Sequence, residues 1–461
     1  MSTADVQHTS VVRTKPLMNM KQILLMNLGF FGIQYSFGMQ QTAVTPIYSF
    51  LGANPHDLPL LNMAGPITGL LIQPIIGAWS DRVWSEKWGR RKAFFLVGAT
   101  GCAIGLFLFP FAAAVWMAVL LLWLLDASNN TAMEPYRAFI ADRLPPAQLG
   151  KGFLAQSFFT GLGITLANLS LMFFQGVFGL GQSVGIPLWV YPAFLLGSVC
   201  SIATVLISVL STPEIPPTEK ELAELRASKG GPGHFIAEIK DAIVDMPVEM
   251  RKLALVYLFQ WYAMNIYWQY VSLSVSQSLY GTTDAQSEGY QLAVANTGVI
   301  NGAYNIVTFC VAFGLVALAR RLGAKWVHAI ALWCATVGLV LFPQLPTLPL
   351  KVVAIVGLGI AWASIMGVPY IMIVRMVPST RYGVYMGIVN MMIVIPMLIQ
   401  TLTFGAIYKN LLGDNPNNAI MAAGILLGIA GLAMLWVKEP PIVRDIEPVG
   451  SGDETVTTKG A

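Results

Sequence analysis

A polar stripe interrupts one long apolar segment, and its side chains are suited to proton chemistry. The stretch W-L-L-D-A-S-N-N-T-A-M-E-P-Y-R-A-F-I-A-D occupies residues 123–142. Residues spaced at i, i+4, i+8 and i+11 share one stripe of a helix, and here they are Asp126, Asn130, Glu134 and Arg137. An ionised carboxylate at the centre of a bilayer costs about 2.5–3.5 kcal/mol, so it is normally neutral, paired or turned toward water.

Two interpretations of Asp126 are open. In the first, it is a structural residue that bonds to a neighbouring helix. In the second, it is a proton-binding site beside a substrate cavity, with Glu134 as a further carboxylate of the coupling site. Glu134 and Arg137 stand at i and i+3, which allows a supporting ion pair.

The elements that position this stripe are membrane helices. Of the 461 residues, 56% are hydrophobic and only 11% are charged, whereas soluble domains carry about 25% charged residues. The chain is therefore expected to lie in a lipid bilayer. The net charge of +4 does not suggest a nucleic-acid partner, and the four cysteines stand singly in apolar segments, without metal or disulfide spacing.

Spanning helices need about 20 apolar residues, and the chain divides into twelve such segments. The predicted spans are 20–46, 60–79, 93–114, 116–141, 151–176, 187–210, 250–276, 291–318, 325–343, 350–376, 383–408 and 419–437. If both termini are cytosolic, the outer loops hold only Lys351 and Lys409 among the basic residues, as the positive-inside rule requires.

The predicted organisation is an all-α membrane protein with two pseudo-symmetric six-helix bundles. Its parts are a tail at 1–19, a bundle at 20–210, a cytosolic linker at 211–249, a bundle at 250–437 and a tail at 438–461. The linker is proline-rich, then charged, then glycine-rich, and predicts short amphipathic helices around 219–227 and after His234.

An internal repeat supports the division into two bundles. P-Y-R-A-F-I-A-D-R-L-P-P-A-Q-L-G, ending at Gly150, recurs as P-Y-I-M-I-V-R-M-V-P-S-T-R-Y-G, ending at Gly383. Such repeats are typical of transporters in which two bundles rock around a central site. Ile360 and Val368 replace the two acids of the stripe, so the acidic stripe belongs to the first half alone.

The loop after the second helix, G-A-W-S-D-R-V-W-S-E-K-W-G-R-R-K, carries a cluster of charges. Arg90 and Arg91 can reach carboxylates on neighbouring helix ends, and such bonds could hold one side of the protein shut in one state. The predicted gating residues are Asp81, Arg90, Arg91, Arg137 and Asp142. The alternative is that the arginines only anchor the loop on the cytosolic side.

Amides and aromatic rings at mid-depth indicate a sugar site, because hydroxyls bond to amides and ring faces pack on aromatic planes. The candidate substrate-binding residues are Gln34, Tyr35, Asn130, Trp261, Asn265, Trp268, Asn301, Asn305 and Asn390. Each one alone is as compatible with a bond between helices, worth about 0.6 kcal/mol on average.

Several of these stretches carry a family resemblance. The loop at 77–92 resembles the signature loop of the major facilitator superfamily, and its S-D-R...S-x-x-W-G-R-R form is similar to that of plant sucrose transporters and animal proton-linked sugar carriers, the glycoside–pentoside–hexuronide type. G-I-Q-Y-S-F-G-M-Q-Q-T-A-V-T-P, G-P-I-T-G-L-L-I-Q-P-I-I-G, L-L-D-A-S-N-N and G-I-V-N-M-M-I-V-I-P resemble their first, second, fourth and eleventh helices. The loop departs from the plant pattern at Lys92, and W-Y-A-M-N-I-Y-W-Q-Y stands in helix seven.

The resemblance implies uptake of a disaccharide or glucoside, sucrose- or maltose-like, by proton symport, with Asp126 matching the fourth-helix acid. A bacterial inner-membrane protein, monomeric and multi-pass, is expected, with a sugar and a proton as partners and no cofactor besides that coupling ion. Sodium coupling, proton-driven export and a non-transporting sugar sensor are the alternatives. The chain carries no nucleophile–base pair or metal cluster at depth, so it is not expected to be an enzyme.

Overall fold

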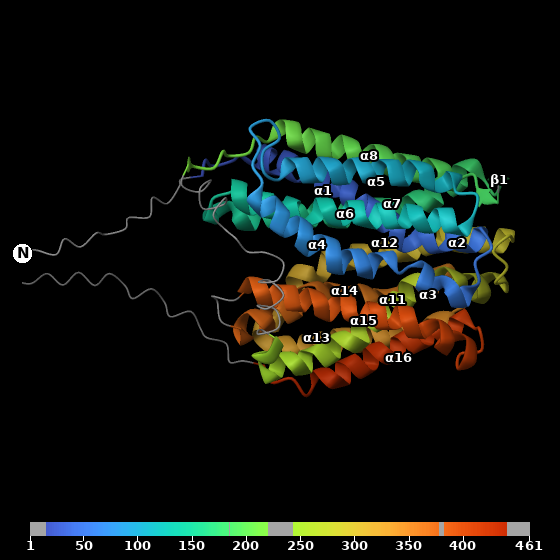
Figure 1. Ribbon diagram of the computed structural model, residues 1–461. Helices are drawn as coiled ribbons and strands as arrows, with labels where there is room; N and C mark the ends of the chain where they lie inside the picture. Colours follow the sequence, from blue (N-terminus) through green and yellow to red (C-terminus); the bar gives the residue numbers. More distant parts are fainter. Residues whose placement is uncertain (1–14, 184, 220–242, 378–381, 440–461) are drawn as a thin grey trace, which may run out of the picture.

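The computed structural model describes residues 15–183, 185–219, 243–377 and 382–439. Two helical bundles lie side by side in it (Figure 1). We call the end where α1 begins and α16 ends the termini side, and the opposite end, with α2, α3 and β1, the far side (Figure 1).

The first bundle is formed by the segment before the linker. Its helices are α1 (Met20–Met39), the π-helical η1 (Gln40–Val44), α2 (Thr45–Phe50), η2 (Pro55–Asp57), α3 (Leu58–Leu61), α4 (Ala64–Arg82), α5 (Lys92–Leu108), η3 (Phe109–Phe111), α6 (Val115–Arg143), α7 (Pro146–Phe178) and α8 (Val190–Ser211). A two-stranded antiparallel hairpin, β1 (Gln182–Ser183) with β2 (Ile186–Pro187), precedes α8.

The second bundle repeats this order of long helices. It contains α11 (Val248–Tyr280), α12 (Glu288–Leu322), α13 (Ala324–Leu341), η4 (Phe342–Gln344), α14 (Leu348–Met376), α15 (Tyr382–Asn410) and α16 (Pro416–Met434). Each of the twelve predicted spans corresponds to a helix of the described chain, so the prediction of an all-α membrane fold is confirmed.

The long helices differ in their apolar content. Among the described residues, eight helical segments are long and apolar enough to cross a membrane by length and composition. The long helices outside that set are α1, α6, α11 and α12. They carry amides and hydroxyls at mid-length, and α6 also carries charges there; these polar groups lower the local hydropathy. The least apolar helices therefore supply much of the polar surface inside the protein.

The internal repeat appears as matching helices. Both α6 and α14 have 29 residues, and each contains an interior proline, Pro135 or Pro369. Neighbouring helices in membranes can re-satisfy the backbone groups that such a proline frees. The amphipathic helices predicted for the linker fall largely on residues 220–242, outside the described residues.

The bundles contact each other along α7 with α12 and along α4 with α15. On α12, Gly298 lies so close to the backbone carbonyl of Asn168 in α7 that a Cβ would not fit. Far-side loops also bond across the bundles, since the Tyr270 hydroxyl donates to the carbonyl of Pro55 at 2.8 Å. Gln286 donates its amide to the carbonyl of Phe50 at 2.6 Å. The far side is therefore closed by direct contacts.

Candidate functional site

A cavity of about 720 Å³ lies between the two bundles. This volume is within the roughly 300–1,000 Å³ range of small-molecule sites. Its wall comes from α1, α4, α6 and α7 of the first bundle and from α11, α12, α14 and α15 of the second. Arg137 and Asn390 mark its extension toward the termini side.

Asp126 lies in this wall on α6 and is 5% exposed. In the described part of the chain its carboxylate has no hydrogen bond or ion pair, and a Cβ added to Gly65 of α4 would lie 3.7 Å from Oδ2. Its backbone is held in place, because the Asn130 amide donates to the carbonyl of Asp126 at 2.9 Å. The site therefore offers a fixed acid whose oxygens face the cavity rather than a protein partner.

The side-chain amide of Asn130 forms its hydrogen bonds within the first bundle. Its Nδ2 also donates to Thr68 Oγ1 at 3.0 Å, and its Oδ1 accepts from Gln73 Nε2 at 2.6 Å. Asn130 lines the cavity, but these bonds tie α6 to α4. A ligand would have to compete with them for the amide.

The predicted pair of Glu134 and Arg137 is present, with Nη1 2.8 Å from Oε1. Both side chains are partly exposed, at 32% and 47%. Arg137 lines the cavity nearer the termini side than Asp126, about three turns further along α6. An exposed pair of this kind contributes at most about 1 kcal/mol of stability, so its position in the cavity wall matters more than its strength.

The opposite wall carries a cluster of three indole rings on α11 and α14. The ring centroids of Trp268 and Trp362 lie 5.4 Å apart, those of Trp261 and Trp362 lie 5.8 Å apart, and the rings are nearly perpendicular. The buried Nε1 of Trp261 has no hydrogen-bond partner in the described chain. The cluster thus offers aromatic faces and an indole N–H at the same place.

Amides beside this cluster are oriented by Gln400 of α15, which is fully buried. Its Oε1 accepts from Asn265 Nδ2 at 2.5 Å, and its Nε2 donates to Gln269 Oε1 at 3.0 Å. Because the Nδ2 of Asn265 donates both to Gln400 and to the carbonyl of Met397, the group that remains for a ligand is the Oδ1 acceptor.

Seven of the nine predicted substrate-binding residues line the cavity: Gln34, Asn130, Trp261, Asn265, Trp268, Asn305 and Asn390. The other two lie outside the cavity wall and bond to protein. The Tyr35 hydroxyl donates to Ser170 Oγ at 2.8 Å, and Asn301 bonds to Tyr267 and Thr42. Further polar or aromatic residues of the wall were not predicted, among them Gln40, Gln41, Gln73 and Trp362.

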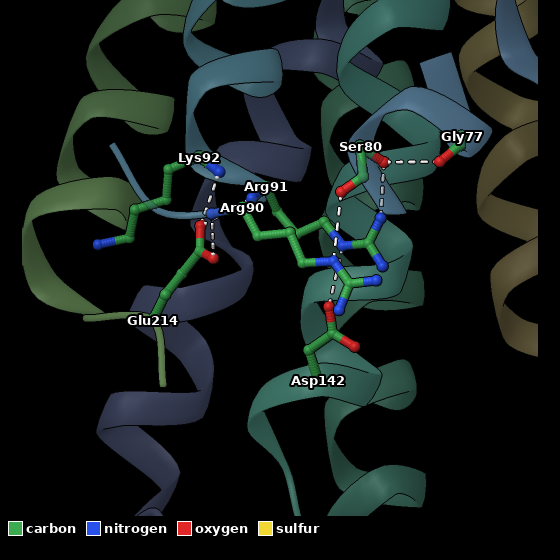
Figure 2. A network of polar contacts seen from close by, with 7 residues as sticks. All are labelled: Gly77, Ser80, Arg90, Arg91, Lys92, Asp142 and Glu214. Atoms are coloured by element: carbon green, nitrogen blue, oxygen red, sulfur yellow. Dashed lines mark hydrogen bonds and ion pairs between the residues drawn. The ribbon is translucent and has the colours of Figure 1, made fainter. Parts of the chain in front are cut away.

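Three of the predicted gating residues, Arg90, Arg91 and Asp142, belong to one network of polar contacts (Figure 2). It lies where α4 ends and α5 begins, on the termini side (Figure 1). Arg91 Nε is 2.9 Å from Asp142 Oδ2, and its Nη1 donates to Ser80 Oγ at 2.6 Å. Arg90 Nε donates to the carbonyl of Ser80 at 3.2 Å. The contact between Arg91 and Asp142 was predicted, and it joins helices of one bundle; the side chain of Asp81 lies outside the described residues.

Glu214, just after α8, is a member of this network that sequence analysis missed. Its carboxylate accepts the backbone N–H groups of Arg90, Arg91 and Lys92 at 2.7, 2.9 and 2.8 Å (Figure 2). These are amides at the start of α5, where a helix favours negative charge. No local sequence signal indicates the partner, since Glu214 is 122 residues from Lys92.

Known proteins resemble the chain over most of its length. The family model described as the Major Facilitator Superfamily matches residues 26–401. The Sucrose transport protein SUT5 of Oryza sativa is 26% identical over 490 residues, covering 91% of this chain and 88% of the rice protein. The Proton-associated sugar transporter A of Homo sapiens is 30% identical over 226 residues, covering 45% of this chain and 30% of the human protein.

Solved structures share the fold. A D-xylose-proton symporter has a TM-score of 0.65 and 16% identity, with 90% of this chain and 97% of the symporter covered. The nucleoside transporter NupG has a TM-score of 0.67 and 15% identity, with 91% and 100% covered. These identities show the fold alone. The relatives and the structural neighbours are transporters rather than enzymes.

Proposed function

Because the chain belongs to the major facilitator superfamily, we propose that it imports a disaccharide or glucoside, sucrose- or maltose-like, together with a proton. Sugar uptake is supported by the sucrose transport proteins, which resemble the chain over 91% of its length. The name of the human relative suggests the proton as the coupling ion.

The observation that carries the proposal is the position of Asp126. A carboxylate that has no hydrogen-bond or ion-pair partner among the described residues lies in the cavity wall, and a cluster of indole rings lies in the wall formed by the other bundle. A sugar has apolar ring faces that pack on indoles and hydroxyls that bond to carboxyls and amides. One pyranose ring between the two walls would satisfy both, and a second sugar or an aglycone would extend along the remaining length of the cavity.

The coupling follows from the chemistry of a carboxyl group. A protonated Asp126 can donate one hydrogen bond to a sugar hydroxyl and accept another, whereas the ionised form can only accept. Since desolvation disfavours the ionised form, a bound proton and a bound sugar stabilise each other. Linkage then requires that the sugar raise proton affinity by the factor by which the proton raises sugar affinity.

We assign the termini side to the cytosol, because the basic residues lie on that side of the predicted topology. The structure then corresponds to an inward-facing carrier: the bundles bond across the far side, and the cavity extends toward the termini side. Release of the proton and the sugar would occur past Arg137 and Asn390.

Transport by purified protein in proteoliposomes tests the proposal. A panel of radiolabelled sugars is offered under an imposed pH gradient, under a sodium gradient and without a gradient. The proposal requires that a disaccharide or glucoside accumulate under the pH gradient and that a protonophore abolish the accumulation. Accumulation under the sodium gradient alone would replace the proton by sodium. Failure of every sugar would reject the substrate class.

A further inference from the structure

The first membrane helix contains a turn that is not α-helical. Residues Gln40–Val44 form a π-helical turn between α1 and α2. A π turn accommodates an additional residue, and such turns are frequent at functional sites. In this turn, adjacent side chains meet different surroundings: Gln40 and Gln41 line the cavity, whereas Thr42 is buried at 2% exposure.

Thr42 links the two bundles through its hydroxyl. The hydroxyl donates to Asn168 Oδ1 of α7 and accepts from Asn301 Nδ2 of α12 at 2.8 Å. Tyr267 of α11 donates its hydroxyl to Asn301 Oδ1 at 2.7 Å. All of these side chains are at most 2% exposed. One threonine hydroxyl therefore completes a buried chain of bonds from the first bundle to the second.

The chain of bonds stands where α12 packs closely against α7. Gly298 of α12 packs against the carbonyl of Asn168, with no room for a Cβ. Asn168 lies in the last third of α7, so the contact is nearer the far side than Asn130 and Arg137 are. If the far side opens by separating α7 from α12, the bond between Thr42 and Asn301 must break. A buried polar atom that loses its hydrogen-bond partner is destabilised, so this bond favours the state that is closed at the far side.

Gln40 connects this turn to the cavity. Its Nε2 is buried in the cavity wall and has no hydrogen-bond partner in the described chain. A ligand hydroxyl would satisfy this amide. Because Gln40 and Thr42 stand two residues apart in one π turn, a shift of the turn that brings Gln40 to a ligand also displaces the Thr42 hydroxyl.

We propose that the turn Gln40–Val44 is a latch on the far side: the Thr42 hydroxyl holds the bundles together, and a ligand bound by Gln40 moves the latch. The role of the Thr42 hydroxyl is independent of what the carrier transports. The role of Gln40 rests on the proposed function, because it needs a sugar in the cavity.

The role of the Thr42 hydroxyl is tested without any sugar. Spin labels at Asn54→Cys and Thr283→Cys, two exposed far-side positions in different bundles, report the far-side distance in proteoliposomes after the native cysteines are replaced. Thr42→Val keeps the shape of the side chain and removes its hydroxyl. It should raise the ratio of protein open at the far side to protein closed there about five- to thirtyfold. Asn301→Ala should act in the same direction.

Asn296→Ala is the matched control on α12, because Asn296 bonds to the Tyr280 hydroxyl within the second bundle. It should leave the distance distribution unchanged. An unchanged distribution in Thr42→Val, in protein that elutes as a folded species, would overturn the latch.

The role of Gln40 is tested by comparing Gln40→Leu with Gln344→Leu, an exposed glutamine outside the cavity wall that bonds to the carbonyl of Val340 within the second bundle. At saturating sugar, Gln344→Leu should still show the wild-type change of distance, whereas Gln40→Leu should show none. A normal response in Gln40→Leu would overturn the coupling. If the far-side distance in the wild-type protein responds to no sugar, both the sugar assignment and the proposed role of Gln40 are rejected. The Thr42→Val experiment still tests whether the Thr42 hydroxyl holds the bundles together.

Discussion

Glu214 and Glu439 hold corresponding places in the two bundles, because the carboxylate of each caps the first backbone amides of the third helix of its bundle. Glu214 bonds to three amides at the start of α5. Glu439 accepts the N–H groups of Ala324 and Lys325, at the start of α13, at 2.9 and 3.2 Å. The equivalence shows that the repeat includes the loops of the termini side as well as the helices.

A lysine returns the contact in each bundle. Lys92 Nζ donates to the carbonyl of Val209 in α8 at 2.8 Å, and Lys325 Nζ donates to the carbonyl of Leu435 after α16 at 2.5 Å. A cation at the end of a helix and an anion at the start of one both oppose the helix dipole. The third and sixth helices of each bundle are therefore joined at the termini side and should move as one body.

The first prediction concerns these caps. Glu214→Ala and Glu439→Ala should each lower the free energy of unfolding by about 1–2 kcal/mol, as loss of a helix cap does. Thermal unfolding in detergent measures the effect, with Glu86→Ala as the control, since Glu86 is an exposed carboxylate. Equal melting temperatures for all three variants would show that the caps contribute nothing to stability.

The second prediction concerns Arg91 and Asp142. Their side chains are in contact, so the effects of Arg91→Gln and Asp142→Asn should not add. A double-mutant cycle should return a coupling free energy of about 0.5–3 kcal/mol. Additive changes in the melting temperature would mean that the ion pair contributes no stability.

A labelling experiment separates gating from anchoring at the same site. If Arg90 and Arg91 favour the state that is closed at the termini side, replacing both with Gln should increase modification of Leu154→Cys, a residue of the cavity wall. Unchanged modification in a folded variant would leave these arginines as anchors of the loop.

The sequence predicts the helices and the acidic stripe well, because both depend on local period and length. Asn301 and Tyr35 show the limit of this prediction. A polar residue in an apolar helix indicates that its side chain does not face lipid, but it does not indicate whether the side chain faces the cavity or another helix. The capping role of Glu214 depends on a contact over 122 residues, and the π turn at Thr42 depends on packing, so neither has a local signal.

The third prediction concerns the wall formed by the second bundle. Trp261→Ala and Asn265→Ala should raise the apparent Kd for sugar by removing a ring face and an acceptor, while expression stays close to that of the wild type. Trp116→Ala is the control, since this ring is 65% exposed at the protein surface and outside the cavity wall. Wild-type affinity in both cavity variants would move the sugar to another face of the cavity.

The most direct test of Asp126 as the coupling site is sugar accumulation by Asp126→Asn under an imposed pH gradient. Asparagine is neutral and nearly isosteric with the protonated acid, so it can still donate and accept hydrogen bonds. The variant should bind sugar and exchange it across the membrane, yet lose both gradient-driven accumulation and sugar-induced proton uptake. Wild-type accumulation in Asp126→Asn would contradict the assignment of this carboxylate as the coupling site and would leave Glu134 as the other acid of the stripe.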